Sequence, residues 1–269
     1  MNIKIKIRNI VLKFLIIRGF YGARVTSNER IKDFFSKINP FITNHALIRI
    51  GSNGDGGYLV PDDLEGIQAC FSPGVSEVAT FELDLSLRKI PSFLADYSVE
   101  SPPIKNELFD FEKKYLGIIN NDKYVTLEDW MQTKVPFGSE FILQMDIEGA
   151  EYGVLLHTPS DVLRKFRIII VEFHNLETLF FPNGLELIDV TFSKLLQDFE
   201  IVHIHPNNCR LPIKVGEIIV PQVMEFTFLR KDRITFKKNN SQFPHPLDIK
   251  NVIQFDDVVL PKCWQGEIY

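Results

Sequence analysis

Residues 167–173 form the strongest strand pattern in the sequence, and they read Arg-Ile-Ile-Ile-Val-Glu-Phe. This β-branched run lacks the polar alternation of a strand with one wet face, so it predicts a central strand buried on both faces of a sheet. Residues 141–145, Phe-Ile-Leu-Gln-Met, predict a second buried strand just upstream. Strands buried on both faces are typical of a parallel sheet covered by helices. The two stretches therefore indicate an α/β fold.

Short apolar runs alternate with longer amphipathic stretches on both sides of this pair, as they do in βαβ units. Strands are expected at residues 68–72, 92–96, 124–125, 141–145, 167–173, 200–205 and 222–229, with helices between the first five. One helix is expected at about residues 77–88, with Val78, Phe81 and Leu85 facing inward. Thr126 and Asp129 stand at capping-box spacing and predict the start of another. The connection between the last two strands lacks a helical pattern, which predicts an antiparallel closing pair.

The composition is that of a globular protein, and it narrows the possible functions. The chain has 269 residues, of which 45% are hydrophobic, and its 30 basic and 35 acidic residues are mixed along the sequence. That mixture gives no basic surface of the kind that nucleic acid requires, so we expect no nucleic-acid partner. Three cysteines, far apart and without a CxxC pair, indicate neither a disulfide framework nor a thiolate metal site, and favour a reducing compartment such as the cytoplasm.

The N-terminal segment differs from the rest of the chain, and we divide the sequence into a helical extension at residues 1–47 and one domain at residues 48–269. Residues 1–20 combine apolar side chains with five basic ones, which are Lys4, Lys6, Arg8, Lys13 and Arg18. The longest apolar run, residues 14–17, is too short to span a membrane, and no secretory cleavage site follows it. Such a segment either packs on the domain as a helix, which we favour, or makes peripheral contact with an anionic membrane surface.

Candidate binding residues follow the first two predicted strands, because ligands of open parallel sheets bind at the carboxyl ends of the strands. Ser72, Gly74 and Ser76 form the first turn, where a glycine lets the backbone approach a ligand, although a plain turn explains the same residues. Asp96 follows Gly74 by about 20 residues, the spacing of an acid that binds ribose hydroxyls. The GxGxxG motif of dinucleotide-binding domains is missing, which argues against a dinucleotide pyrophosphate.

Three carboxylates, those of Asp146, Glu148 and Glu151, crowd the end of the strand at residues 141–145. Like charges at a buried strand end repel each other, so they are expected to face a cation, a ligand amine or hydrogen-bond donors. The two glutamates are equally explained as acids in the first turn of a helix, whereas Asp146 is not.

The segment MDIEGAEYGVL at residues 145–155 resembles the hallmark D-x-E-G-A-E segment of FkbM-type S-adenosylmethionine-dependent methyltransferases. Five further segments resemble a branch of that family: RIGSNGDGGYLVPDDL at 49–64, CFSPGVSEVATFE at 70–82, VTLEDW at 125–130, IIIVEFH at 168–174 and VHIHPNN at 202–208. Together they cover roughly residues 49–230. The resemblance implies a Rossmann-like class I methyltransferase fold, a mostly parallel seven-stranded sheet with a C-terminal antiparallel strand.

The resemblance also implies a function and a site. S-adenosylmethionine is expected to lie on Gly74, its neighbours Ser72 and Ser76, and Asp96, with Asp146 beside the methyl-donor end. The segment with Asp55 and Tyr58 is expected over the edge of the cofactor. The implied reaction is O-methylation of a small-molecule or glycan acceptor, such as a sugar hydroxyl in a surface glycan or a secondary metabolite.

Glu172 and His174 end the strand at residues 167–173, and strand alternation points them to the same side. We weigh three roles for them. His174 acts as the general base for an acceptor hydroxyl, or Asp146, Glu172 and His174 bind Mg²⁺ or another divalent ion, or Glu172 merely holds His174 in place. His203 and His205 share one strand face and are expected to be polar face residues or acceptor-site hydrogen bonders rather than metal ligands.

Two other functions compete with methyl transfer. One is that of a nucleotide-sugar or nicotinamide-linked Rossmann enzyme, which the missing glycines and the closing antiparallel pair disfavour. The other is a methyltransferase-like domain that binds a glycan or a partner without turnover, which the presence of Asp146, Glu172 and His174 disfavours.

Overall fold

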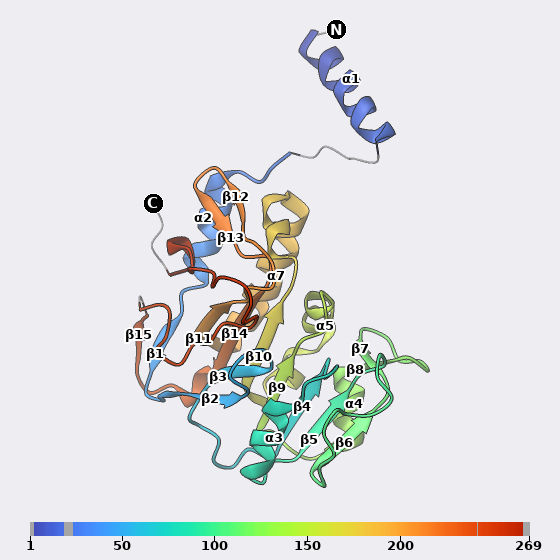
Figure 1. Cartoon of the computed structure of the whole chain (residues 1–269), viewed down its shortest axis with the longest axis vertical. Helices are drawn as coiled ribbons and strands as arrows, with labels where there is room; N and C mark the ends of the chain where they lie inside the picture. The colour runs from blue at the N-terminus through green and yellow to red at the C-terminus, as the bar shows by residue number, and fades with distance from the viewer. Residues whose placement is uncertain (1–2, 19–23, 241, 266–269) are drawn as a thin grey trace.

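The computed structural model describes residues 3–18, 24–240 and 242–265. Its centre is a seven-stranded sheet of order β11-β14-β10-β9-β4-β5-β6 (Figure 1). The strands are β4 (Ala69–Pro73), β5 (Ser92–Ala95), β6 (Phe109–Glu112), β9 (Phe141–Met145), β10 (Phe166–Phe173), β11 (Phe199–Pro206) and β14 (Met224–Arg230). The pairs from β6 to β10 are parallel, and β14 runs antiparallel to both β10 and β11. The predicted Rossmann-like fold with a closing antiparallel strand is thereby confirmed.

The two strands that decided the prediction lie side by side in the middle of this sheet. Every residue of β9 and β10 is buried, and Val171 pairs with Met145 in parallel register. Successive side chains of β10 enter different cores: Ile169 and Val171 pack on one face of the sheet, whereas Ile168 and Ile170 pack on the other. This explains why the sequence shows no polar alternation there.

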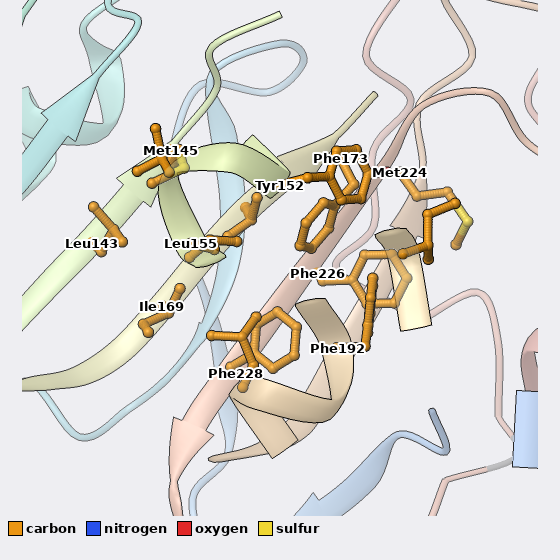
Figure 2. Close-up of a cluster of buried hydrophobic side chains, with 14 of the residues drawn as sticks. Leu143, Met145, Tyr152, Leu155, Ile169, Phe173, Phe192, Met224, Phe226 and Phe228 are labelled. Carbon is orange, nitrogen blue, oxygen red and sulfur yellow. The ribbon is translucent and has the colours of Figure 1, made fainter. Parts of the chain in front are cut away.

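One face of the sheet carries the larger core. It is covered by α4 (Leu127–Lys134), α5 (Glu151–His157), α6 (Ser160–Leu163) and α7 (Pro182–Asp198), with the 3₁₀ turn η1 (Leu176–Phe180) between β10 and α7. Figure 2 shows Phe192 of α7 among Phe173, Phe226 and Phe228 of the strands. Thr126 caps α4 by accepting a hydrogen bond from the Asp129 amide, as the capping-box spacing predicted.

The other face carries α3 (Thr80–Leu87) and the hairpin of β2 (Leu47–Gly51) and β3 (Gly57–Pro61). Phe81 and Leu85 of α3 are buried there, as predicted. Val78 is not: it precedes the helix and is 39% exposed. The turn of the β2–β3 hairpin carries Asp55, and the start of β3 carries Tyr58, to the cavity at the carboxyl end of the sheet.

The third strand was predicted wrongly. Residues 124–126 form β8 (Tyr124–Thr126), which pairs with β7 (Tyr115–Gly117) in a separate small parallel sheet. The third strand of the main sheet is β6, and residues 96–108 before it form no helix. Because β6 is a short edge strand with partly exposed residues, its sequence lacks the apolar run of a buried strand.

Segments from near both ends of the chain pack into the larger core. Helix α2 (Asn28–Lys37) buries Phe34 and Phe35 in the larger core, and β1 (Phe41–Thr43) pairs with β15 (Lys237–Asn239). Near the C-terminus, the turn η3 (Lys262–Gln265) brings Trp264 into the same core. Strands β12 (Ile213–Val215) and β13 (Ile218–Val220) form a hairpin between β11 and β14, and the short turn η2 (Lys231–Arg233) follows β14.

Helix α1 (Ile3–Ile17) stands apart from the α/β body in Figure 1. None of its described apolar side chains is buried, so the packing on the domain that we favoured from the sequence is not seen. No helix in the described part of the chain has the length and apolar character to cross a membrane.

Candidate active site

A cavity of about 720 Å³ opens at the carboxyl ends of β4, β5 and β9. Six of the residues expected to contact a cofactor line it: Asp55, Tyr58, Gly74, Ser76, Asp96 and Asp146. Ser72 lies below its floor, and Glu172 and His174 lie outside its lining, next to Asp146. The residues expected from their position after the strands therefore lie together at one end of the sheet.

Gly74 is required by the packing of two strand ends against each other. Its φ of +90° is in the left-handed region, and a Cβ at this position would lie 1.5 Å from the carbonyl oxygen of Asp146. Its amide donates to the Ala95 carbonyl at 2.9 Å. Only glycine fits between these backbones, so the turn leaves open the space where a ligand would lie.

Asp96, which follows β5, connects the end of that strand to the turn after β4. Its Oδ2 accepts a hydrogen bond from the Ser76 amide at 2.9 Å, and its Oδ1 accepts from the Ser98 amide at 2.7 Å and the Ser98 hydroxyl at 2.6 Å. These bonds fix a buried carboxylate at the cavity wall. Oxygen lone pairs remain that can accept hydrogen bonds from the hydroxyls of a ligand.

The cavity floor is a buried polar chain that the sequence analysis missed. The Ser72 hydroxyl contacts a carboxyl oxygen of Glu82 and donates to Gln144 Oε1 at 2.6 Å, and Gln144 Nε2 donates to the Tyr58 hydroxyl at 3.2 Å. Burial raises the pKa of Glu82, which favours a neutral carboxyl that donates to Ser72. No sequence signal identified Glu82, because its position in α3 fits an ordinary helix.

Glu151 organises the D-x-E-G-A-E turn. Glu148 and Gly149 are both in the left-handed region, with φ of 57° and 105°. The Oε1 atom of the fully buried Glu151 accepts hydrogen bonds from the Ile147 amide at 3.2 Å and the Gly149 amide at 3.0 Å. The same atom lies 3.1 Å from His174 Nδ1. Glu151 is thus more than the first-turn acid to which the sequence pointed, since it ties the turn to the end of β10.

Carboxylates surround His174. Its Nε2 lies 3.5 Å from Glu148, 3.6 Å from Glu172 and 3.8 Å from Asp146. Burial alone would lower the pKa of His174, but the hydrogen bond to Glu151 and the neighbouring carboxylates outweigh it and raise the pKa. An Nδ1–H donated to Glu151 leaves the Nε2 lone pair on the side of Asp146.

The pKa values of Asp146 and Glu172 are both raised, which favours the protonated form of each carboxyl. Burial, with Glu148 and Glu151 adding repulsion against the attraction of His174, raises the pKa of Asp146 to about 7. Burial also raises the pKa of Glu172 well above its usual value, and Asn207 Nδ2 donates to its two oxygens at 3.2 and 3.3 Å. The Oδ1 atom of Asp146 is buried without a hydrogen-bond partner. Such shifts at a cavity are typical of catalytic sites.

Three of these residues have the geometry of metal ligands. One ligand atom each from Asp146, Glu148 and His174 lies within 4.8 Å of the others. This set contains Glu148, which is 83% exposed, in place of the Glu172 that the sequence analysis included. Two carboxylates and an imidazole suit a divalent ion, and the unpaired Asp146 oxygen fits the same role.

His203 and His205 contact another part of the chain. His203 Nε2 lies 2.9 Å from Asp248 Oδ1, and His205 Nδ1 lies 3.8 Å from Asp248 Oδ2. Asp248 belongs to residues 242–260, which we call the C-terminal strap. Asn208 also holds the strap, through a hydrogen bond from its Nδ2 to the Val252 carbonyl at 2.9 Å. The two histidines are therefore polar partners of the strap.

The sheet order, the closing antiparallel strand and the cavity at the carboxyl strand ends define a Rossmann-like methyltransferase fold. Residues 123–200 match the family model described as the methyltransferase FkbM domain. The match contains the D-x-E-G-A-E turn, Glu172 and His174, and it confirms the resemblance noted in the sequence. It supports a methyltransferase, although it does not extend to Gly74 or Asp96. A comparison with curated proteins found no match.

Proposed function

We propose that this chain is an S-adenosylmethionine-dependent O-methyltransferase. The proposal rests on one observation. Gly74, Asp96 and Asp146 line the same cavity, and Asp146 lies next to His174, which belongs to the matched methyltransferase segment. A volume of about 720 Å³ is in the range of pockets that hold cofactor-sized ligands. The absence of a GxGxxG loop disfavours dinucleotides, whereas a nucleoside without a pyrophosphate does not need that loop.

When bound, the cofactor would supply a methyl group carried on a positively charged sulfur, and that sulfur would keep the electron pair of the bond broken when the acceptor oxygen bonds to the methyl carbon. Asp96 accepts hydrogen bonds from the ribose hydroxyls. The acidic group formed by Asp146 and Glu148 favours a cation at this end of the cavity. Backbone hydrogen bonds fix the Asp96 carboxylate, and the Glu151 carboxylate accepts from the Ile147 and Gly149 amides and so holds the turn that carries Asp146 and Glu148. These residues therefore position the two reactants rather than forming bonds with them.

His174 removes the proton that the acceptor hydroxyl loses. Its Nε2 carries the lone pair when Nδ1–H is donated to Glu151, and the carboxylate of Glu151 stabilises the imidazolium that results. The pKa of a histidine in this environment is raised, so His174 is a competent base at neutral to mildly alkaline pH.

A divalent ion is a second way to activate the acceptor, and the cluster of Asp146, Glu148 and His174 favours it. Such an ion would lower the pKa of the acceptor hydroxyl, and the same three residues would hold it. Chelation distinguishes the two mechanisms: a base mechanism survives treatment with EDTA, whereas a metal mechanism loses activity and regains it when Mg²⁺ or Mn²⁺ is added.

For the acceptor we propose a sugar hydroxyl in a glycan or a secondary metabolite, on the strength of the family resemblance. We also propose a cytoplasmic location, because the described cysteines are free. We propose no nucleic-acid partner, in keeping with the net charge of −5.

Calorimetric titration of the full chain with S-adenosylmethionine, S-adenosylhomocysteine and NAD, with and without Mg²⁺, tests the cofactor. Micromolar binding of the sulfur nucleosides alone is expected, and Asp96→Ala should weaken it at least about tenfold because charge-assisted hydrogen bonds are lost. Asp122→Ala, at an exposed loop position, is the matched control. Binding of NAD alone, or of no ligand, would overturn the proposal.

Methyl transfer to a panel of glycans separates catalysis from mere binding. Asp146→Ala should keep cofactor affinity within about tenfold and lose at least about 100-fold in turnover. If the wild-type protein binds the cofactor and transfers no methyl group to any acceptor, the non-catalytic interpretation is favoured instead.

A further inference from the structure

Helix α1 presents a continuous apolar stripe that the rest of the structure does not cover. Ile7, Ile10, Phe14 and Ile17 are spaced by three or four residues, so they lie on one side of the helix. Their exposed fractions are 57%, 67%, 57% and 82%. In Figure 1 the helix stands away from the α/β body. An apolar stripe of this kind exposed to water indicates an interaction site.

The charge around the stripe is of one sign. Six basic residues and no acidic residue precede Glu29, although acidic residues outnumber basic ones in the whole chain. Two of them are described in or directly after α1: Lys13 is exposed, and the guanidinium of Arg18 lies over the Phe14 ring at 5.1 Å. Long basic side chains beside apolar ones are able to reach anionic groups while their stems stay in apolar surroundings.

We propose that α1 lies in the plane of an anionic membrane surface and holds the enzyme there. Its 15 residues extend about 22 Å, which is shorter than the roughly 30 Å of a hydrocarbon core, so the helix suits the interface rather than a crossing. The stripe enters the boundary between headgroups and acyl chains, and the basic residues contact lipid phosphates.

A lipid surface fits α1 better than a second copy of the chain does. Two α1 helices packed through their stripes would bring two sets of basic residues together, with no acidic residue in either helix to offset the repulsion. Anionic headgroups supply the missing negative charge. The lipid contact stands independently of the methyltransferase proposal. If both hold, the enzyme acts at a membrane surface, where an acceptor carried on a lipid is within reach.

Flotation of the purified full chain with phosphatidylglycerol-containing and pure phosphatidylcholine vesicles tests the proposal. We expect binding to the anionic vesicles, weakened by salt. The triple variant Ile10→Asn, Phe14→Asn, Ile17→Asn should lower the partition coefficient at least about tenfold. Lys13→Ala should lower it by about fivefold, the effect of one basic residue at an anionic surface.

The matched control is the double variant Phe137→Asn, Leu211→Asn, which alters exposed apolar residues of the α/β body. It should float like the wild-type protein. Equal flotation of the α1 triple variant and the wild-type protein would overturn the proposal, as would an α1-dependent dimer without vesicle binding. The triple variant should still bind S-adenosylmethionine. Vesicle binding without cofactor binding in the wild-type protein would therefore contradict the methyltransferase proposal alone.

Discussion

The sheet, the turn and the cavity all depend on the absence of a side chain at Gly74. Gly74→Ala would place a methyl group on the Asp146 carbonyl, and backbone on both sides limits relaxation. We expect a loss of about 2–4 kcal/mol in unfolding free energy and at least about tenfold in cofactor affinity. Urea denaturation and calorimetry measure the two effects.

Gly216→Ala is the control for the backbone conformation alone. Gly216 also has a positive φ, of 62°, but an added Cβ there meets no atom within 4 Å. It should cost only about 1 kcal/mol, the typical strain of a left-handed residue. If Gly74→Ala cost no more than this control, the close approach to Asp146 would be unimportant.

Glu151 sets the protonation of His174, and its effect is visible in the pH dependence of the reaction. Glu151→Gln keeps an oxygen for the Ile147 and Gly149 amides and removes the negative charge that raises the pKa of His174. A base is active when neutral, so a lower pKa should move the acid limb of the kcat/KM profile to lower pH, by up to about one pH unit. Rate profiles and NMR titration of the imidazole measure the shift.

Glu128→Gln, on the exposed side of α4, is the control and should leave the profile unchanged. An acid limb that stays in place in Glu151→Gln, while NMR shows the lowered pKa, would exclude His174 as the base.

At the scale of elements, the C-terminal strap is held to β11 by charge. Burial alone would raise the pKa of Asp248, but the neighbouring imidazoles of His203 and His205 hold it well below its usual range. A depressed carboxyl pKa stabilises the fold above the unfolded value of about 4, and this contribution is lost as the pH falls below it. The pKa of His205 is raised, despite burial, by the same carboxylate, so its contribution is largest below about pH 6.5.

Asp248→Asn should therefore destabilise the protein by about 1–3 kcal/mol, and more at about pH 5.5 than at about pH 8. Urea denaturation at the two pH values measures the difference, and limited proteolysis shows whether the strap is released. Asp256→Asn, an exposed strap position, should have little effect at either pH. A destabilisation by Asp248→Asn that does not vary with pH would show that His205 draws no stability from this carboxylate.

At the scale of the whole molecule, segments from near both ends of the chain complete the core of the sheet. Phe35 of α2 and Trp264 of η3 have ring centroids 4.8 Å apart, and both are buried in the same cluster as Leu143 and Ile169. Phe35→Ala should cost about 3–5 kcal/mol and lower Tm by roughly 2–4 °C for each kcal/mol. Calorimetry should show one transition for the α/β body.

Leu87→Ala is the control, because Leu87 is 73% exposed. Two separate transitions, or a cost below about 1 kcal/mol for Phe35→Ala, would show that α2 is an appendage of the sheet rather than part of its core.

The sequence was able to predict those elements whose signal is local. It located β9 and β10, the cap at Thr126 and the closing antiparallel strand, because each depends on neighbouring residues or on an unbroken apolar run. It failed at β6, because this short edge strand has no apolar run, whereas the chain at residues 124–126 does have a strand-like pattern but pairs outside the main sheet. Contact with β5 decides between them, and that contact is not local.

The sequence by itself determined that polar residues gather at the carboxyl ends of the strands, since the positions of the strands along the chain and the alternation of their side chains follow from local patterns. Only the tertiary structure decided their partners. Glu151 meets His174, Ser72 meets Gln144 and His203 meets Asp248 across 23, 72 and 45 residues of sequence. Such pairings depend on how the elements pack, and packing is fixed by the burial of the whole core rather than by any one segment.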